Sequence, residues 1–382
     1  AKDIPDYNNC GITSERSIEM TDAFEQQFTQ IFDVVSSVFL NQDENVLSDS
    51  DVVHSTLKAM KSFISVVDIR FFIATPLFPI LCNNYMSSPE YAFDVVDIFG
   101  EIANAIEMPP EFRELIPTVF KSVIQGLSPI ITNENNEVKT IIASLDPNMV
   151  QVLASSLTSF LLRFSNIVLF IDDGMWARTA IEWLIQVTEV AKGDAFHTCL
   201  DFWMKVTRTC HNEFLKQQQQ QEANNSSTSI NQLPFYGSFF SPLEQILIAK
   251  FVEPFEVDQR EDEDGIQWEE VIETTSPLYV PMKASLVFLT NMNSTEVFSL
   301  LMNLSNEASS NLEMLNRFAW NAACLTSSIC DNFTAKAFEI VASSSALIGN
   351  SFLWFVSQHP RFLAGHPGIL QGVIQKILES LI

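Results

Sequence analysis

The stretch PEYAFDVVDIFGEIAN (Pro89–Asn104) indicates the fold most clearly, because its apolar residues recur every three or four positions. Phe93, Val96 and Phe99 follow this spacing, which places them along one side of an α-helix. The stretch also begins with proline, a residue favoured in the first turn of helices. It therefore predicts an amphipathic helix that buries one face.

A second stretch, GDAFHTCLDFWMKVTR (Gly193–Arg208), has Phe196 and Phe202 at the same offset as Phe93 and Phe99. Helices of this kind are predicted along most of the chain, over 21–40, 50–67, 68–85, 110–127, 146–164, 176–191, 241–251, 281–291, 295–307, 312–330, 334–343, 347–358 and 367–381. Helix pairs that recur about every 40–47 residues are typical of HEAT repeats. The predicted fold is all-α, a HEAT-repeat α-solenoid in which antiparallel helix pairs stack into a curved superhelix.

The composition favours a helical protein that binds other proteins. The chain has 382 residues, 47% of them hydrophobic, and only 11 glycines, which are too few for a turn-rich β-protein. With 21 basic and 47 acidic residues, its formal charge is −26. Such a surface repels nucleic acids and anionic membranes and attracts basic protein surfaces. We expect no direct nucleic-acid or membrane partner.

The six cysteines are predicted to be reduced, buried thiols of an intracellular protein, because none forms a CxxC motif. The longest apolar run, Leu157–Ile171, is interrupted by Arg163 and Asn166, so no membrane span is expected. The first residues lack the basic-then-apolar layout of a signal peptide.

Two segments interrupt the helical pattern and divide the chain. HEAT-like helix pairs are predicted over 1–216, a low-complexity, disordered inter-repeat loop over 217–242, and further helix pairs over 243–382. The last part contains an acidic segment at 253–280. Ten acidic residues and Arg260 give residues 253–273 a charge of −9.

The acidic segment is predicted to form a projecting β-hairpin. Its centre, Asp262-Glu263-Asp264-Gly265, has the composition of a tight turn, and polar and apolar residues alternate on both sides of it. Such a charge run can be a solvated loop. Its length and the presence of Trp268 favour a functional loop instead.

No catalytic motif is present in the sequence. Patterns for nucleotide binding, zinc proteases and serine hydrolases are absent. His197, Cys199, Cys210 and His211 are zinc-ligand residue types, but their spacing distributes them around several helix faces. We therefore expect no enzyme activity, no catalytic residues, no metal and no cofactor.

Four segments carry a resemblance to a known family. The segment FLWFVSQHPRFLAGHPGILQGVIQKILE (352–379) resembles the helix-break-helix of the exportin 1 family of nuclear export receptors, in the importin-β (karyopherin) superfamily. Its matching residues are Val356, Gln358, Pro360, Arg361, Phe362, Leu363 and His366, whereas Ser357 and His359 depart from the pattern. Three further segments are similar to that family, in the family's order. The first matches at Val53, His54, Thr56, Leu57 and Phe63, and the second at Phe196, Cys199, Leu200 and Trp203. The third matches at Leu315, Asn316, Trp320, Ser328 and Ile329.

The resemblance implies that the chain is a central section of a divergent exportin that shuttles between nucleus and cytoplasm. The partners it implies are the GTPase Ran in its GTP form, export cargo proteins with leucine-rich signals, and nuclear pore proteins. The acidic segment would be the family's Ran-contacting loop, which regulates cargo binding. The cargo groove and the family's reactive cysteine are expected beyond Ile382. The Ran-binding residues so implied are Glu256, Asp258, Glu261, Asp262, Glu263, Asp264, Trp268, Glu269 and Glu270.

Two other functions are compatible with the same residues. One is an intracellular HEAT-repeat scaffold or adaptor unrelated to nuclear transport, in which the acidic segment is a solvated spacer. The other is an all-helical enzyme with an unfamiliar motif. Binding to Ran loaded with GTP or GDP separates the transport function from the scaffold function.

Overall fold

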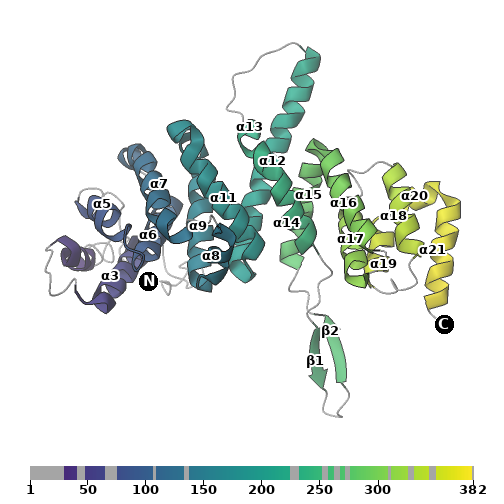
Figure 1. The fold of residues 1–382 in the computed structure, drawn as a ribbon, viewed down its shortest axis with the longest axis horizontal. Coiled ribbons are helices and arrows are strands. Elements are labelled where there is room, and N and C mark those ends of the chain that lie inside the picture. The colour runs from purple at the N-terminus through teal and green to yellow at the C-terminus, as the bar shows by residue number, and fades with distance from the viewer. Residues whose placement is uncertain are drawn as a thin grey trace, which may run out of the picture. The chain divides into compact units, whose positions relative to one another are not determined.

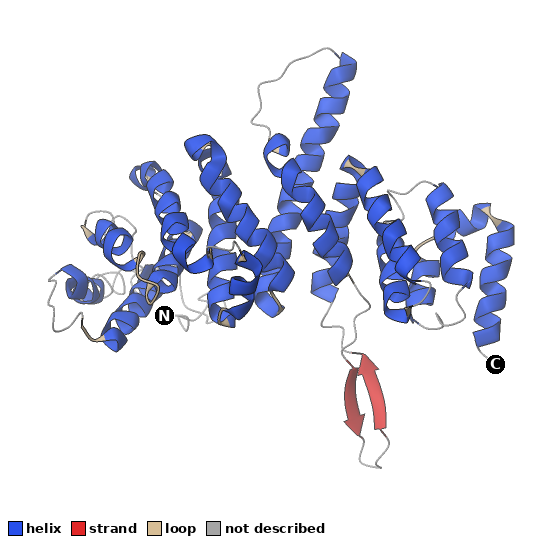
Figure 2. Cartoon of the chain, in the orientation of Figure 1, coloured by secondary structure: helices blue, strands red, loops and turns tan. Residues whose placement is uncertain are grey.

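The computed structural model describes residues 30–40, 48–64, 75–105, 109–132, 137–223, 232–251, 257–261, 267–271, 276–308, 311–325, 331–343 and 350–380. These residues are helical apart from short connections and one pair of short strands (Figures 1 and 2). The chain divides into two compact units, Ala1–Cys199 and Leu200–Ile382. The boundary lies inside the long helix α12 (Gly193–Ala223). The predicted helical class is confirmed.

The described part of unit 1 is helical apart from short connections. Its elements are a helix over 30–40, α3 (Ser50–Ile64), α5 (Leu77–Ile80), a π-helical turn η2 (Leu81–Tyr85), α6 (Ala92–Asn104), α7 (Pro110–Ile131), α8 (Val138–Ser144), α9 (Pro147–Arg163), α10 (Ser165–Val168), η3 (Ile171–Gly174), α11 (Met175–Val190) and the start of α12. The helices form two layers. In one layer α3 packs on α6 and α6 packs on α9, and in the other α7 contacts α11.

The helices of the first layer run parallel, as equivalent helices of successive repeats do. Nδ1 of His54 on α3 lies 2.5 Å from Oδ2 of Asp94 on α6. Further along both helices, Lys61 donates to Asp97 at 2.6 Å. The contacts advance in the same direction on both helices. This arrangement fits stacked HEAT-like helix pairs within unit 1.

Helices α6 and α9 approach closely. The Ser156 hydroxyl donates to the Val96 carbonyl at 3.1 Å, and Arg163 donates to the Ala103 carbonyl at 2.8 Å. Gly100 permits this approach, because a Cβ at that position would collide with the Ser156 side chain. The bonds satisfy polar groups that the interface would otherwise bury without partners.

The two stretches that share a sequence pattern are buried as predicted. Phe93 and Phe99 of α6 are 7% and 0% exposed, and Phe196 and Phe202 of α12 are 7% and 0% exposed. The recurrence of Phe at this offset therefore marks helix faces that contact neighbouring helices in the array.

Unit 2 contains the remaining helices and both strands. After α12 come α13 (Leu233–Tyr236), η4 (Gly237–Phe239), α14 (Phe240–Lys250), β1 (Val257–Glu261), β2 (Gln267–Val271), α15 (Ser276–Met292), α16 (Ser294–Ala308), α17 (Leu312–Cys324), α18 (Asp331–Ser343), α19 (Asn350–Ser357), α20 (Pro360–Gly365) and α21 (Pro367–Ser380). Consecutive helices pack on one another, with α16 against α17 and α14 against α15, while α17 also packs on α19.

Two segments differ from the sequence-based expectation. Helix α12 continues to Ala223, so residues 217–223 of the expected loop are helical, and α13, η4 and the start of α14 occupy 233–242. Gln, Glu and Ala are good helix formers, which explains why a polar run extends the helix. The break around Pro360 contains a short helix of its own, α20, with Pro360 at its first position. Residues 224–231 lie outside the described residues.

Candidate functional site

The acidic segment was expected over 253–280, but residues 276–280 belong to α15, so the segment between α14 and α15 ends at residue 275. The two strands lie in this part. Figure 2 shows the two strands side by side, and they pair antiparallel. Val257 is opposite Val271, and Glu261 is opposite Gln267. Of the predicted Ran-binding residues, two lie on β1 and three on β2, namely Asp258, Glu261, Trp268, Glu269 and Glu270. The other four, Glu256, Asp262, Glu263 and Asp264, lie outside the described residues.

The strand register places like charges opposite each other. Asp258 is opposite Glu270, and Arg260 is opposite Trp268. The two strands contain four acidic residues and one arginine, a charge of −3 in ten residues. Like charges at directly opposite positions destabilise a strand pair, and an isolated two-stranded hairpin is only marginally stable. A cationic partner would reduce this repulsion.

Three of the four described cysteines, Cys82, Cys210 and Cys324, are poor nucleophiles. Cys82, Cys199, Cys210 and Cys324 form no disulfide. Burial raises the pKa of Cys82 to about 11 and of both Cys210 and Cys324 to about 12, so these thiols stay protonated at neutral pH. Cys10 and Cys330 lie outside the described residues.

The zinc-ligand residue types on α12 do not converge in the described residues. No group of three or more His, Cys, Asp or Glu residues there could hold a metal ion. The His211 ring lies 5.2 Å from the Phe288 ring, and burial lowers the pKa of His211. His211 is thus partly buried against Phe288.

The two histidines around Pro360 differ in environment. Nδ1 of His366 lies 2.9 Å from the Phe362 carbonyl oxygen, and its ring stacks on the Phe362 ring at 4.1 Å. His359 is 5% exposed and lies against Phe338 and Phe355, and its Nε2 has no hydrogen-bond partner among the described residues. Burial lowers the pKa of His359 to about 4, so the ring is neutral at physiological pH.

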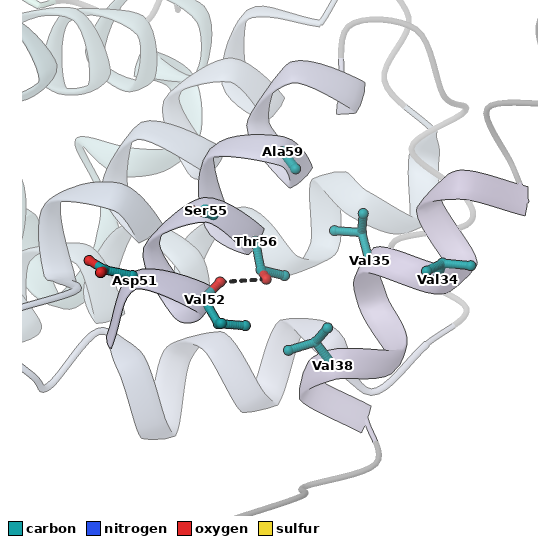
Figure 3. Close-up of a pocket in the computed structure, with 8 residues that line it drawn as sticks. All are labelled: Val34, Val35, Val38, Asp51, Val52, Ser55, Thr56 and Ala59. Atoms are coloured by element: carbon teal, nitrogen blue, oxygen red, sulfur yellow. Dashed lines mark hydrogen bonds between the residues drawn. The ribbon is translucent and has the colours of Figure 1, made fainter. Parts of the chain in front are cut away.

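A shallow apolar groove in unit 1 was not foreseen from the sequence. It has a volume of about 400 Å³ and lies between the helix over 30–40 and α3 (Figure 3). Its lining residues are Val34, Val35, Val38, Asp51, Val52, Ser55, Thr56 and Ala59. The Thr56 hydroxyl is bonded to the Val52 carbonyl at 2.7 Å, and Asp51 is the single titratable residue of the lining. The groove therefore contains no arrangement of acid, base and nucleophile.

None of the described helices is both long and apolar enough to cross a membrane.

The comparisons with known proteins point to one family. A family model described as Exportin 1-like protein matches residues 1–99. Exportin-1 of Drosophila melanogaster is 23% identical over the whole of this chain, which covers 37% of that protein. Exportin-1 of Schizosaccharomyces pombe and of Dictyostelium discoideum are 22% and 20% identical, again over the whole chain and 38% of each relative. The chain thus spans a little over a third of the length of these relatives, and its similarity to exportin 1 is one of low identity along the whole chain.

Proposed function

We propose that this chain is the Ran-contacting, central part of a nuclear export receptor that shuttles through the nuclear pore. In this proposal the receptor binds Ran·GTP together with cargo proteins that carry leucine-rich export signals. It acts by binding alone, without catalysis or a cofactor. The similarity to proteins named exportin-1 along the whole chain is the single observation that carries the proposal.

The proposed contact with Ran is the acidic segment. Its residues Asp258, Glu261, Trp268, Glu269 and Glu270 occupy the two strands, where the register leaves like charges opposed. A basic surface on the GTPase would relieve that repulsion and gain attraction from the chain's overall charge of −26. Glu256, Asp262, Glu263 and Asp264 belong to the same proposed contact. The attraction should weaken with added salt.

The proposed regulation follows from linkage between two binding events. If the acidic segment has two docking positions, and both Ran·GTP and cargo tolerate the same one, each ligand favours binding of the other. The coupling free energy between the two ligands is limited by the difference in each ligand's affinity for the two positions. A chain without two positions would bind both ligands independently.

The proposal is tested by comparing Ran loaded with GTP and with GDP in a pull-down with this protein. The expected result is retention of the GTP form alone, and cargo carrying a leucine-rich signal should increase that retention. Equal retention of both forms, or none of either, would remove the transport function. The finding would then favour a scaffold in which the acidic segment is a solvated spacer.

A further inference from the structure

The helix ends on either side of the acidic segment meet in one aromatic cluster. Phe251 follows the last residue of α14, and Tyr279 lies in the first turn of α15. Their ring centroids are 5.1 Å apart. Both rings also lie against Trp320 of α17, at 6.4 Å and 5.6 Å. Side chains at the ends of α14 and α15 and on α17 therefore close the base of the segment.

Asn321, the neighbour of Trp320, binds the backbone where the chain leaves α14. Its side chain is fully buried, and Nδ2 donates to the carbonyls of Ile248 and Phe251, each at 3.1 Å. The last carbonyls of a helix have no partners within that helix. Asn321 supplies partners for two such groups from another helix. It thereby caps α14 at the point where the acidic segment begins.

The same asparagine is imperfectly satisfied. The two hydrogens on Nδ2 are shared among three acceptors, since the Arg317 carbonyl lies 2.9 Å away as well, whereas Oδ1 is buried without a hydrogen-bond partner among the described residues. A buried acceptor without a partner lowers stability. An apolar residue at this position would avoid that loss but would release the carbonyls of Ile248 and Phe251. Asn321 therefore contributes by fixing the position of the end of α14.

We infer that Asn321 and the rings of Phe251, Tyr279 and Trp320, which we call the root cluster, fix the base of the acidic segment on α17. The inference rests on the proposed function, because it concerns the same Ran-contacting segment. Asn321 is a positioning residue in this scheme, since it acts through the end of α14 and contacts no partner itself.

The root cluster lowers the conformational entropy that the acidic segment loses when a partner binds. A segment of this length gains conformational freedom if its two ends separate, and ordering it then opposes association. With the flanking residues Phe251 and Tyr279 both held at Trp320, the two helix ends are already close together. Binding of a cationic partner then costs less free energy, because these ends need not be brought together on binding.

The inference is tested by a distance measurement within unit 2. Nitroxide labels are placed at Gln259→Cys on β1 and Ser299→Cys on α16, with Cys10 and Cys330 changed to serine. Double electron–electron resonance then gives the distribution of distances between the labels. We expect Asn321→Ala to broaden this distribution. The matched control is Ser156→Ala, which removes another side-chain bond to a neighbouring helix, in unit 1, and should leave the distribution unchanged.

An unchanged distribution in Asn321→Ala would overturn the inference. If that variant does not fold, Phe251→Leu removes one ring of the root cluster and carries the same expectation. Binding provides a second arm: Asn321→Ala should lower the affinity for Ran·GTP roughly fivefold, but not in a variant that lacks residues 252–275. Equal losses in both backgrounds would also overturn the inference. If the parent protein binds no Ran·GTP, the proposed function fails, while the distance measurement still decides the role of the root cluster.

Discussion

The two units of the chain differ in how well they satisfy buried polar groups. In the described part of unit 1, Oε1 of Gln151 is the one buried side-chain nitrogen or oxygen without a hydrogen-bond partner. The described part of unit 2 has six such groups, on Tyr236, Glu244, Arg317, Asn321, Trp354 and His359. Native proteins leave few polar atoms unsatisfied, and exceptions gather at functional sites.

The described part of unit 1 therefore satisfies its buried polar groups more completely than the described part of unit 2, which carries the proposed site. In unit 1, the α6–α9 interface pairs Ser156 and Arg163 with backbone carbonyls. In unit 2, Glu244 lies on α14 and Asn321 on α17, and each has a buried oxygen without a hydrogen-bond partner among the described residues. At Asn321 this loss of stability accompanies two bonds to the end of α14.

The largest expected effect is at Glu244. Its replacement removes one of the unsatisfied buried polar groups by which unit 2 differs from unit 1. Glu244 is 1% exposed, and burial together with Glu296 raises its pKa to about 8. The unfolded chain ionises near pH 4.5, so the contribution of Glu244 is intact below that value and is lost as pH rises to 8. Glu244→Met should raise the free energy of unfolding at pH 7 by on the order of 3 kcal/mol.

The measurement is urea unfolding of parent and variant between pH 5 and pH 9. The stability difference between them should grow with pH up to about 8 and then level off. The exposed Glu111→Gln serves as the control and should show no such trend. If the stability difference between parent and Glu244→Met does not change with pH, burial does not raise the pKa of Glu244.

The second prediction tests the close packing of unit 1. Gly100→Leu places a side chain where the Ser156 side chain lies, and overpacking of this kind costs about 3 kcal/mol. Urea unfolding should show the loss, and Gly372→Leu, at a glycine with open space around its Cα, should not. Equal effects of both substitutions would contradict a tight α6–α9 interface.

The third prediction concerns His359 and acid stability. Burial lowers its pKa to about 4, whereas the unfolded chain titrates near 6.5. Stability is therefore intact above pH 6.5 and falls as pH decreases towards 4. His359→Phe should remove this loss, worth about 2 kcal/mol at pH 5. Thermal unfolding at pH 5 and pH 7 measures it, and an equal effect at both pH values would count against a buried, neutral His359.

The smallest expected effect is at the exposed ion pair between α3 and α6. Lys61 and Asp97 are partly exposed to solvent, and such pairs contribute about 0.5 kcal/mol. Lys61→Met should lower the free energy of unfolding by about that amount at low salt and by less at high salt. A loss as large as that of Gly100→Leu would show that unit 1 depends on charge pairs more than on packing.

The helical fold was predictable from the sequence because its signal is local. Phe93, Phe99, Phe196 and Phe202 follow the helical period, and all four are buried. The extension of α12 to Ala223 was missed because a glutamine-rich run has both low complexity and good helix propensity. Here the helix continues through the run.

The root cluster could not be predicted, because it depends on contacts between distant positions. Asn321 lies 73 and 70 residues from Ile248 and Phe251, whose carbonyls it binds at the end of α14, and no periodicity links Phe251 to Trp320. The resemblance drew attention to Trp320 but not to its neighbour. The acidic strands, in contrast, lie in a segment whose charge and turn residues are visible in the sequence.

The most direct test of the account is the salt dependence of Ran·GTP binding by the parent protein and by the variant Asp258→Asn/Glu269→Gln/Glu270→Gln. The account predicts that the variant binds on the order of tenfold more weakly at low salt and loses less affinity as salt is added. A matched variant, with Glu111, Glu114 and Glu182 changed to glutamine on exposed helix faces of unit 1, should behave like the parent. Identical affinities and salt slopes for the strand variant and the parent would contradict a role for the acidic segment in binding Ran.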